Sequence, residues 1–244
     1  MSVRLAKPRK GSIPIHVVDR ERLGATLDTL EPAGRAWVQA LGFNGSADTH
    51  VLVPGYSFDL FKPARREPGE LTLPSTDAAR RALIVAEAMA ATRDLVNTPA
   101  EQMGPGALAE AVRLVAQQHG AKFRQVVGDE LLKQNFPAIH AVGRAADAAS
   151  GRAPRLIELT WGRPKHPLVT IVGKGVCFDS GGLDIKSAEG MRLMKKDMGG
   201  AAHALGLAQL VMALELPLRV QLLIPAVENA IAGNAFRPGD VFQT

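Results

Sequence analysis

Helical and strand-like hydrophobic patterns alternate along this chain from residue 78 onward. Apolar positions recur at helical spacing in some segments, and in others they alternate or run continuously, as strands do. The predicted helices are Ala78–Val96, Gly106–Gln118, Asp129–Gln134 and Gly199–Glu215. The predicted strands are Lys122–Val127, Arg155–Trp161, Pro167–Val172 and Leu218–Val227. This alternation predicts a layered α/β domain with a mixed, mostly parallel sheet.

Capping and turn residues support several of these boundaries. The run Ser75–Asp77 offers N-caps to the first long helix, and Pro99 follows its end. Gly120 stands directly after the second helix, where a left-handed residue commonly closes the last turn. The run Pro167–Val172 is continuously apolar and rich in β-branched residues, which is typical of a strand buried inside a sheet.

The first 70 residues have a less regular pattern, which predicts a separate small domain. Ser12–Val18 and His50–Pro54 are predicted as short strands, and Arg20–Leu41 as an interrupted helix. The charged, turn-rich stretch Lys62–Gly69 is typical of a connector. We therefore expect a small N-terminal α/β domain over 1–70, a connecting helix over 71–97 and a larger α/β domain over 98–244.

Composition and charge exclude several classes of protein. Hydrophobic residues make up 46% and charged residues 22% of the 244 residues, as in ordinary globular proteins. The sequence has no apolar run of about 18 residues, and the N-terminus lacks the apolar stretch of a secretory signal. The single cysteine, Cys177, excludes an internal disulfide framework and fits a reducing cytoplasm. The net charge of +5 is dispersed, so nucleic-acid binding is not favoured.

The residues with the clearest chemical potential follow the apolar run that ends at Val172. That run leads into Gly173–Gly175, where two glycines flank Lys174, and a glycine pair follows soon after Asp179. Ligands bind at the carboxyl ends of strands in open α/β sheets, and glycine lets a backbone approach a ligand closely. We therefore expect a binding loop at this point of the chain.

Four ionisable side chains in this region are candidates for metal chemistry: Lys174, Asp179, Lys186 and Asp197. Carboxylates are hard oxygen donors suited to divalent cations. An amine close to such cations is driven to lose its proton, after which it can coordinate metal or polarise a carbonyl. Small residues after Asp197 open a helix and are expected to let it pack close to the loop.

Two other interpretations of the same segment stay open on these residues alone. An ordinary glycine-rich loop with solvated charges would need no ligand. A phosphate-binding loop is less favoured, because neither glycine-rich phosphate motif follows the strand and two aspartates lie nearby. Among neighbouring residues, Cys177 is expected to be a small buried filler. His203 is expected to have a packing role or to contact the site from one and a half helical turns away.

The segment from Val172 to Ala202 resembles the active-site segment of leucyl (cytosol) aminopeptidases, metallopeptidase family M17. The resemblance rests on the order Lys174, Asp179, Lys186 and Asp197, spaced by five, seven and eleven residues. Flanking segments are also similar to the family and extend the resemblance over residues 78–244. These are Arg93–Pro99, Phe136–Arg144 and Glu228–Val241.

The resemblance implies a dinuclear-metal aminopeptidase that releases N-terminal, preferably apolar residues such as leucine. Lys174, Asp179 and Asp197 match metal ligands, with Asp179 bridging two ions, and Lys186 matches the lysine that polarises the scissile carbonyl. Met194 matches a wall of the pocket for the first side chain. The implied cofactors are two divalent ions, zinc or manganese, with magnesium as a further option. The implied protein is a cytoplasmic homo-hexamer, not bound to membranes, that acts on peptides with a free N-terminus.

The chain differs from the family pattern in two places. The second acidic motif of the family, Asn-Thr-Asp-Ala-Glu-Gly-Arg, is expected shortly after Val241, but the sequence ends at Thr244. We therefore expect a truncated catalytic domain that lacks two metal-binding carboxylates and does not reach full activity alone. A segment is also expected to be missing between Pro54 and Gly55. The alternative function is a non-catalytic oligomeric scaffold or DNA-binding accessory of the same family.

Overall fold

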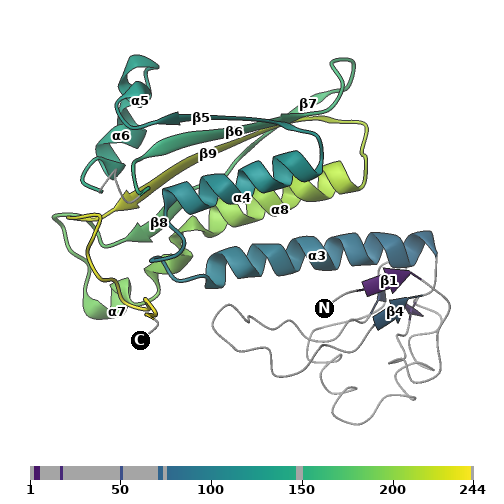
Figure 1. The fold of residues 1–244 in the computed structure, drawn as a ribbon, viewed down its shortest axis with the longest axis horizontal. Coiled ribbons are helices and arrows are strands. Elements are labelled where there is room, and N and C mark those ends of the chain that lie inside the picture. The colour runs from purple at the N-terminus through teal and green to yellow at the C-terminus, as the bar shows by residue number, and fades with distance from the viewer. Residues whose placement is uncertain are drawn as a thin grey trace, which may run out of the picture. The chain divides into compact units, whose positions relative to one another are not determined.

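The computed structural model describes residues 76–146 and 151–242 in full, and the backbone of four short strands before them (Figure 1). These strands are Val3–Leu5 (β1), Val17–Val18 (β2), His50–Val51 (β3) and Leu71–Leu73 (β4). β1 pairs with β4 in parallel, and β2 pairs with β3 antiparallel. β2 and β3 fall within the strands predicted at 12–18 and 50–54. The predicted helix at 20–41 and the junction after Pro54 lie outside the described residues.

The chain divides into two compact units, Met1–Glu87 and Ala88–Thr244. The division falls within the long helix α3, Asp77–Asn97, which matches the predicted helix closely. Thr76 caps the start of α3, because its hydroxyl oxygen accepts a hydrogen bond from the Ala79 N–H at 3.1 Å. The domain boundaries expected near residues 70 and 97 stay a prediction.

The larger unit contains a five-stranded sheet, in which β9 has partners on both sides (Figure 1). The strands are Lys122–Val127 (β5), Arg155–Trp161 (β6), Leu168–Val172 (β7), Gly175–Asp179 (β8) and Arg219–Asn229 (β9). β9 pairs antiparallel with β6 and parallel with both β7 and β8, and β5 pairs antiparallel with β6. The mixed sheet is confirmed. The expected parallel majority is not, since β6 runs opposite to both of its neighbours.

The strands β7 and β8 lie end to end along the same side of β9, separated only by Gly173 and Lys174. The sequence predicted a loop at β8, because the glycines interrupt the apolar pattern. The prediction that β7 is buried is also wrong, since most of its residues are exposed and Val172 is 67% exposed. β7 pairs with β9 alone among the described strands, so it lies at an edge of the described sheet.

One face of the sheet is covered by α4, Pro105–Gln118, and α8, Gly199–Ala213 (Figure 1). Residues along β9 alternate between more and less buried, as expected when one face of a strand packs against helices. The core between these layers includes Leu108, Val112, Ile157, Leu159, Leu205, Leu222 and Ile224. The short helices α5, Glu130–Lys133, and α6, Pro137–Gly143, pack together, and α6 also contacts β9. Within the described residues, no helix is both long and apolar enough to cross a membrane.

Small residues let the start of α8 lie directly against the junction of β7 and β8, as the sequence predicted. A Cβ atom added to Gly173 would lie 2.7 Å from Ala201 Cα and 2.8 Å from Gly200 O. The Ala201 N–H donates a hydrogen bond to the Lys174 carbonyl at 2.8 Å. Gly173 is therefore required by the close approach of two backbones.

The Gly173→Ala protein is expected to be less stable than the wild type by about 1–3 kcal/mol, because the new methyl group would overlap the α8 backbone. Urea denaturation measures this difference. Gly199→Ala is the matched control, because a Cβ at Gly199 would have nothing within 4 Å and its φ of −57° is helical. The control is expected to be neutral or slightly stabilising. Equal destabilisation by both changes would contradict the proposed packing.

Candidate metal centre

The structure pairs the four candidate residues as two lysine–aspartate ion pairs. Lys174 Nζ lies 2.7 Å from both carboxylate oxygens of Asp197, and Lys186 Nζ lies 3.1 Å from Asp179 Oδ2. Lys174 follows β7 and Asp179 ends β8, so both belong to the edge that runs along β9. Asp197 lies in the short 3-10 helix η1, Met194–Met198, which packs against β8.

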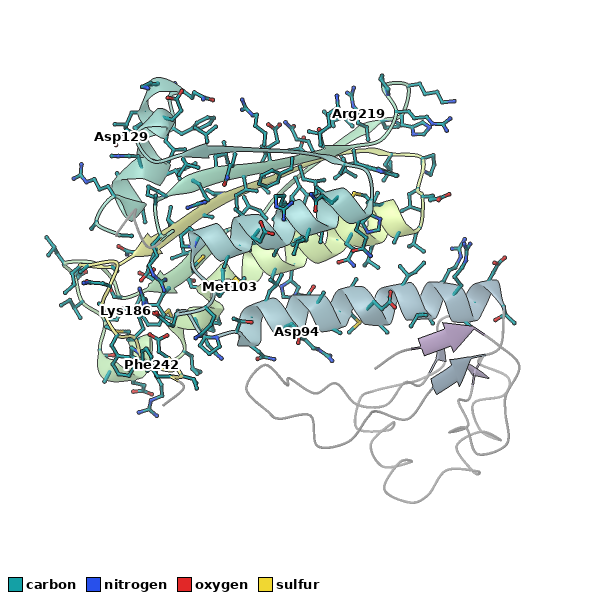
Figure 2. The ribbon with its side chains drawn as sticks, viewed as in Figure 1. Asp94, Met103, Asp129, Lys186, Arg219 and Phe242 are labelled. Atoms are coloured by element: carbon teal, nitrogen blue, oxygen red, sulfur yellow. The ribbon has the colours of Figure 1, made fainter. Side chains whose placement is uncertain are left out.

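The loop after β8 places Lys186 at the carboxyl end of the parallel strands (Figure 2). Gly181 and Gly182 have φ angles of +91° and +68°, which other residues rarely adopt. A Cβ on Gly181 would lie 2.1 Å from the Asp184 carbonyl oxygen, so the turn is too tight for a side chain. The Lys186 N–H then donates to the Ser180 carbonyl at 3.0 Å. These constraints turn the chain back and bring Lys186 to Asp179.

The Asp179 carboxylate is held by three donors. Its Oδ1 accepts from the Gly181 N–H at 2.9 Å and from Asn229 Nδ2 at 2.8 Å, and its Oδ2 pairs with Lys186. Burial alone raises the pKa of this carboxyl, but the hydrogen bonds from Gly181, Asn229 and Lys186 favour the charged form and outweigh it. The pKa of Asp179 therefore lies below its usual value, and the group is ionised at neutral pH.

The second pair is more open to solvent on the lysine side. The Lys174 side chain is 61% exposed, whereas that of Asp197 is 20% exposed. In the same short helix, Lys195 donates a hydrogen bond to the carbonyl of Asn97, at the end of α3. Burial lowers the pKa of Lys195. The helix that carries Asp197 is thus anchored on one side by Lys195 and on the other by packing against β8.

The other residues singled out from the sequence have varied placements. Met194 begins η1 and is half-buried, and its role as a pocket wall stays a prediction. Cys177 is buried, as expected, and burial raises the pKa of its thiol far above the usual range. The packing role expected for His203 is wrong, because the side chain is exposed and its Nδ1 lies 2.7 Å from the Gly199 carbonyl of its own helix.

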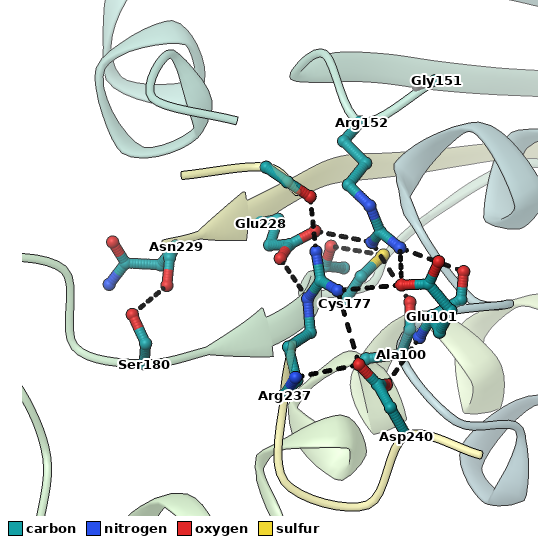
Figure 3. Close-up of polar contacts among 12 residues, drawn as sticks. Ala100, Glu101, Gly151, Arg152, Cys177, Ser180, Glu228, Asn229, Arg237 and Asp240 are labelled. Atoms are coloured by element: carbon teal, nitrogen blue, oxygen red, sulfur yellow. Dashed lines mark hydrogen bonds and ion pairs between the residues drawn. The ribbon is translucent and has the colours of Figure 1, made fainter. Parts of the chain in front are cut away.

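A buried network of charged side chains lies beside the ends of β8 and β9 (Figure 3). Glu228 is 0% exposed, and its two carboxylate oxygens accept from Arg152 Nη1 at 2.7 Å and from Arg237 Nε at 2.5 Å. Both arginines also contact Glu101 Oε2, at 3.2 and 3.1 Å. The Asp240 carboxylate accepts from the backbone N–H groups of Arg237 and Glu101. Segments far apart in the sequence are thereby joined around one buried carboxylate.

The buried arginines have further partners on the backbone. Arg152 donates to the carbonyls of Ala100 and Glu101 at 3.1 and 3.0 Å, and Arg237 Nη2 donates to the Gly233 carbonyl at 2.7 Å. A buried charge is tolerated when it is both paired and hydrogen-bonded, as here. The sequence did not predict this network. The proximity of Glu228 to Arg237 was visible, but nothing in the sequence marked Arg152 as their partner.

The donor set fits a divalent cation in part. Asp179 and Asp197 offer carboxylate oxygens, which zinc, magnesium and manganese accept, and Lys174 offers an amine. No group of three or more His, Cys, Asp or Glu side chains is placed to hold a metal within residues 76–146 and 151–242. Two carboxylates and an amine leave a four- to six-coordinate ion with open positions, so a complete centre needs further ligands.

Comparison with known proteins identifies the family. The model described as the cytosol aminopeptidase family, catalytic domain, matches residues 90–244. This chain belongs to the cytosol aminopeptidase family. A probable cytosol aminopeptidase from Rhodococcus opacus is 34% identical to it over 241 residues, covering 91% of this chain and 47% of that protein. The chain thus spans about half the length of the curated relatives it matches.

Solved structures of the family share the fold. The crystal structure of a cytosol aminopeptidase from Coxiella burnetii is 40% identical with a TM-score of 0.69, covering 99% of this chain and 64% of that one. The bottromycin maturation enzyme BotP in complex with Mn is 38% identical with a TM-score of 0.61, covering 74% and 40% respectively. Membership in family M17 and the α/β fold with a mixed sheet, both expected from the sequence, are confirmed.

Proposed function

We propose that this chain is the catalytic part of a dinuclear-metal aminopeptidase that releases N-terminal, preferably apolar residues such as leucine from peptides. The observation that carries the proposal is the formation of two lysine–aspartate ion pairs, Lys174 with Asp197 and Lys186 with Asp179, along the edge formed by β7 and β8. Family membership supports it, since relatives are named cytosol aminopeptidases. A cytoplasmic homo-hexamer without membrane attachment is part of the same proposal.

In this proposal Lys174, Asp179 and Asp197 would hold divalent cations. Zinc and manganese are the favoured ions and magnesium is a third option; the BotP structure contains manganese. When bound, the ions supply a Lewis acid and an activated water. In the described structure each carboxylate is paired with a lysine, so the lysines balance the negative charge that a cation would otherwise balance. A complete centre would need further ligands.

Lys186 is proposed to act on the substrate. Its side chain is 33% exposed, so its ammonium can reach a peptide. A cationic donor placed where negative charge develops on the carbonyl oxygen stabilises the transition state. Asp179 orients this lysine through their contact. Met194 is proposed as part of the wall that receives the first side chain of the peptide.

The proposal is tested with the 244-residue protein and leucyl-4-nitroanilide, in the presence of manganese or zinc and after chelation. Metal-dependent release of nitroaniline is expected. Asp197→Ala removes a carboxylate donor and is expected to lower the rate more than about 100-fold. Changes to residues that only contact a metal ligand typically lower activity roughly 10–100-fold. Asp184→Ala is the matched control, since this acidic residue is exposed in the loop after β8.

The outcomes also distinguish the proposed aminopeptidase from the alternative function. No hydrolysis by the wild type with either metal, or an equal loss in Asp184→Ala, would contradict the proposal. The alternative, a non-catalytic scaffold or DNA-binding accessory, draws on the net charge of +5. It predicts no hydrolysis together with retention on DNA that weakens steeply as salt rises.

A further inference from the structure

Asn229, the last residue of β9, faces Asp179 across the sheet. The two residues are partners in the parallel register of β8 and β9. Asn229 Nδ2 donates to Asp179 Oδ1 at 2.8 Å. The backbone on either side is fixed as well, because the Ser180 N–H and hydroxyl donate to the Asn229 carbonyl at 2.9 and 2.8 Å (Figure 3).

The amide of Asn229 is confined on its other side by the glycine loop. A Cβ on Gly182 would lie 2.9 Å from Asn229 Oδ1, so the amide oxygen lies close to the Gly182 backbone. An ionised carboxylate only accepts hydrogen bonds, so the amide must present its NH2 group to Asp179. The orientation of the Asn229 side chain therefore follows from both neighbours.

This contact determines which oxygen of Asp179 is available. Oδ1 is occupied by two donors, the Gly181 N–H and Asn229 Nδ2, whereas among the described residues Oδ2 contacts only the ammonium group of Lys186. With one oxygen held on two sides, the carboxylate plane has little freedom to rotate. A cation that binds Oδ2 has to displace one partner, Lys186.

The end of β9 is itself immobilised by the buried network. Glu228, adjacent to Asn229, is 0% exposed and is held by Arg152 and Arg237. Arg152 is anchored in turn on the Ala100 carbonyl. A side chain at position 229 is thus presented from a rigid point of the fold, as a group that orients a metal ligand needs to be.

We propose that Asn229 is a positioning residue, whose amide holds the Asp179 carboxylate in the orientation that binds a divalent cation. The inference rests on the metal site of the proposed function and adds a residue to it. Groups that hydrogen-bond to metal-binding carboxylates typically contribute 10–100-fold to metal affinity. The loss of the Asn229 donor is expected to weaken binding by roughly 10-fold or more.

The experiment is a calorimetric titration of the 244-residue protein with Mn²⁺ alone, together with a thermal melt of each variant. Asn229→Leu keeps the branching at Cγ and removes the donor, and it is expected to bind Mn²⁺ roughly 10-fold more weakly. Asn229→Ala only removes atoms and is expected to show the same loss, so it decides the question if the leucine variant does not fold. Asp179→Ala gives the Mn²⁺ affinity of a site that lacks the Asp179 carboxylate.

Gln221→Met provides a matched control on the same strand. Gln221 Nε2 donates to Glu158 Oε1 at 2.8 Å, so β9 carries a second amide–carboxylate contact away from the candidate site. Methionine has nearly the same length and lacks the donor. This variant is expected to bind Mn²⁺ with wild-type affinity. A weakening equal to that of Asn229→Leu would overturn the positioning role.

The remaining outcomes separate the inference from the proposed function. Wild-type affinity in Asn229→Leu and Asn229→Ala, with binding lost in Asp179→Ala, overturns the role of Asn229 and leaves the metal site standing. Weak binding in Asn229→Ala with wild-type binding in a folded Asn229→Leu shows that shape rather than the hydrogen bond matters, and also overturns it. Absence of Mn²⁺ binding by the wild type overturns both proposals.

Discussion

The Glu228→Gln protein is expected to unfold with a free energy about 3–5 kcal/mol lower than that of the wild type. Glu228 is fully buried, and its carboxylate lies between Arg152 and Arg237, which are themselves buried. Glutamine keeps the shape but removes the charge, so two buried guanidinium groups lose their shared partner. Glu101 and Asp240 contact these arginines at longer distances and replace only part of the lost interaction.

Urea denaturation followed by circular dichroism measures this change, with linear extrapolation to water. Glu110→Gln is the control, because Glu110 forms an exposed ion pair with Arg113 within α4. Exposed ion pairs contribute little, so this variant is expected to unfold like the wild type. A Glu228→Gln protein as stable as the wild type would show that the arginines find other partners or that water reaches them.

The Lys186→Met protein is expected to lose roughly 10²–10³-fold in kcat for leucyl-4-nitroanilide, the loss typical of removing one donor to a developing oxyanion. This expectation rests on the proposed function. Its Mn²⁺ affinity is expected to be no weaker than that of the wild type. In the described structure Lys186 contacts Asp179 Oδ2, so removing the ammonium would leave that oxygen free for a cation.

Steady-state kinetics and a Mn²⁺ titration on the same preparation separate the two effects of this change. Lys196→Met is the matched control, because Lys196 is an exposed lysine next to Asp197. The substitution removes the same positive charge as Lys186→Met. It is expected to retain wild-type kcat. A parallel loss of Mn²⁺ affinity in Lys186→Met would mean that this lysine holds the site together. An equal loss of kcat in the control would point to net charge as the cause.

Local patterns were sufficient for most of the secondary structure. The strands β5 and β6 begin and end where the alternating pattern predicted. In β5 the boundaries are marked by Gly120 and Gly128, which have positive φ angles and lie on either side of the strand. β8 was missed because Gly173 and Gly175 interrupt the apolar pattern. The pairing that makes β8 a strand is with β9, about fifty residues later in the chain, and no local pattern reports it.

The exposure of β7 also depends on strand pairing that no local pattern reports. A β-branched apolar run is typical of a central strand, but burial depends on how many neighbours the strand has. Among the described strands β7 has one, β9, and most of its side chains face solvent. Hydrophobicity predicted the strand correctly and its position in the sheet incorrectly.

By itself the sequence determined the family and the chemical groups of the candidate site, because the spacing of Lys174, Asp179, Lys186 and Asp197 is carried within one continuous segment. Only the tertiary structure decided which lysine pairs with which aspartate. It also decided that Asn229 holds Asp179 and that Glu228 is buried between two arginines. These contacts join residues up to 76 positions apart, so their distances and burial follow from strand pairing and packing rather than from neighbouring residues.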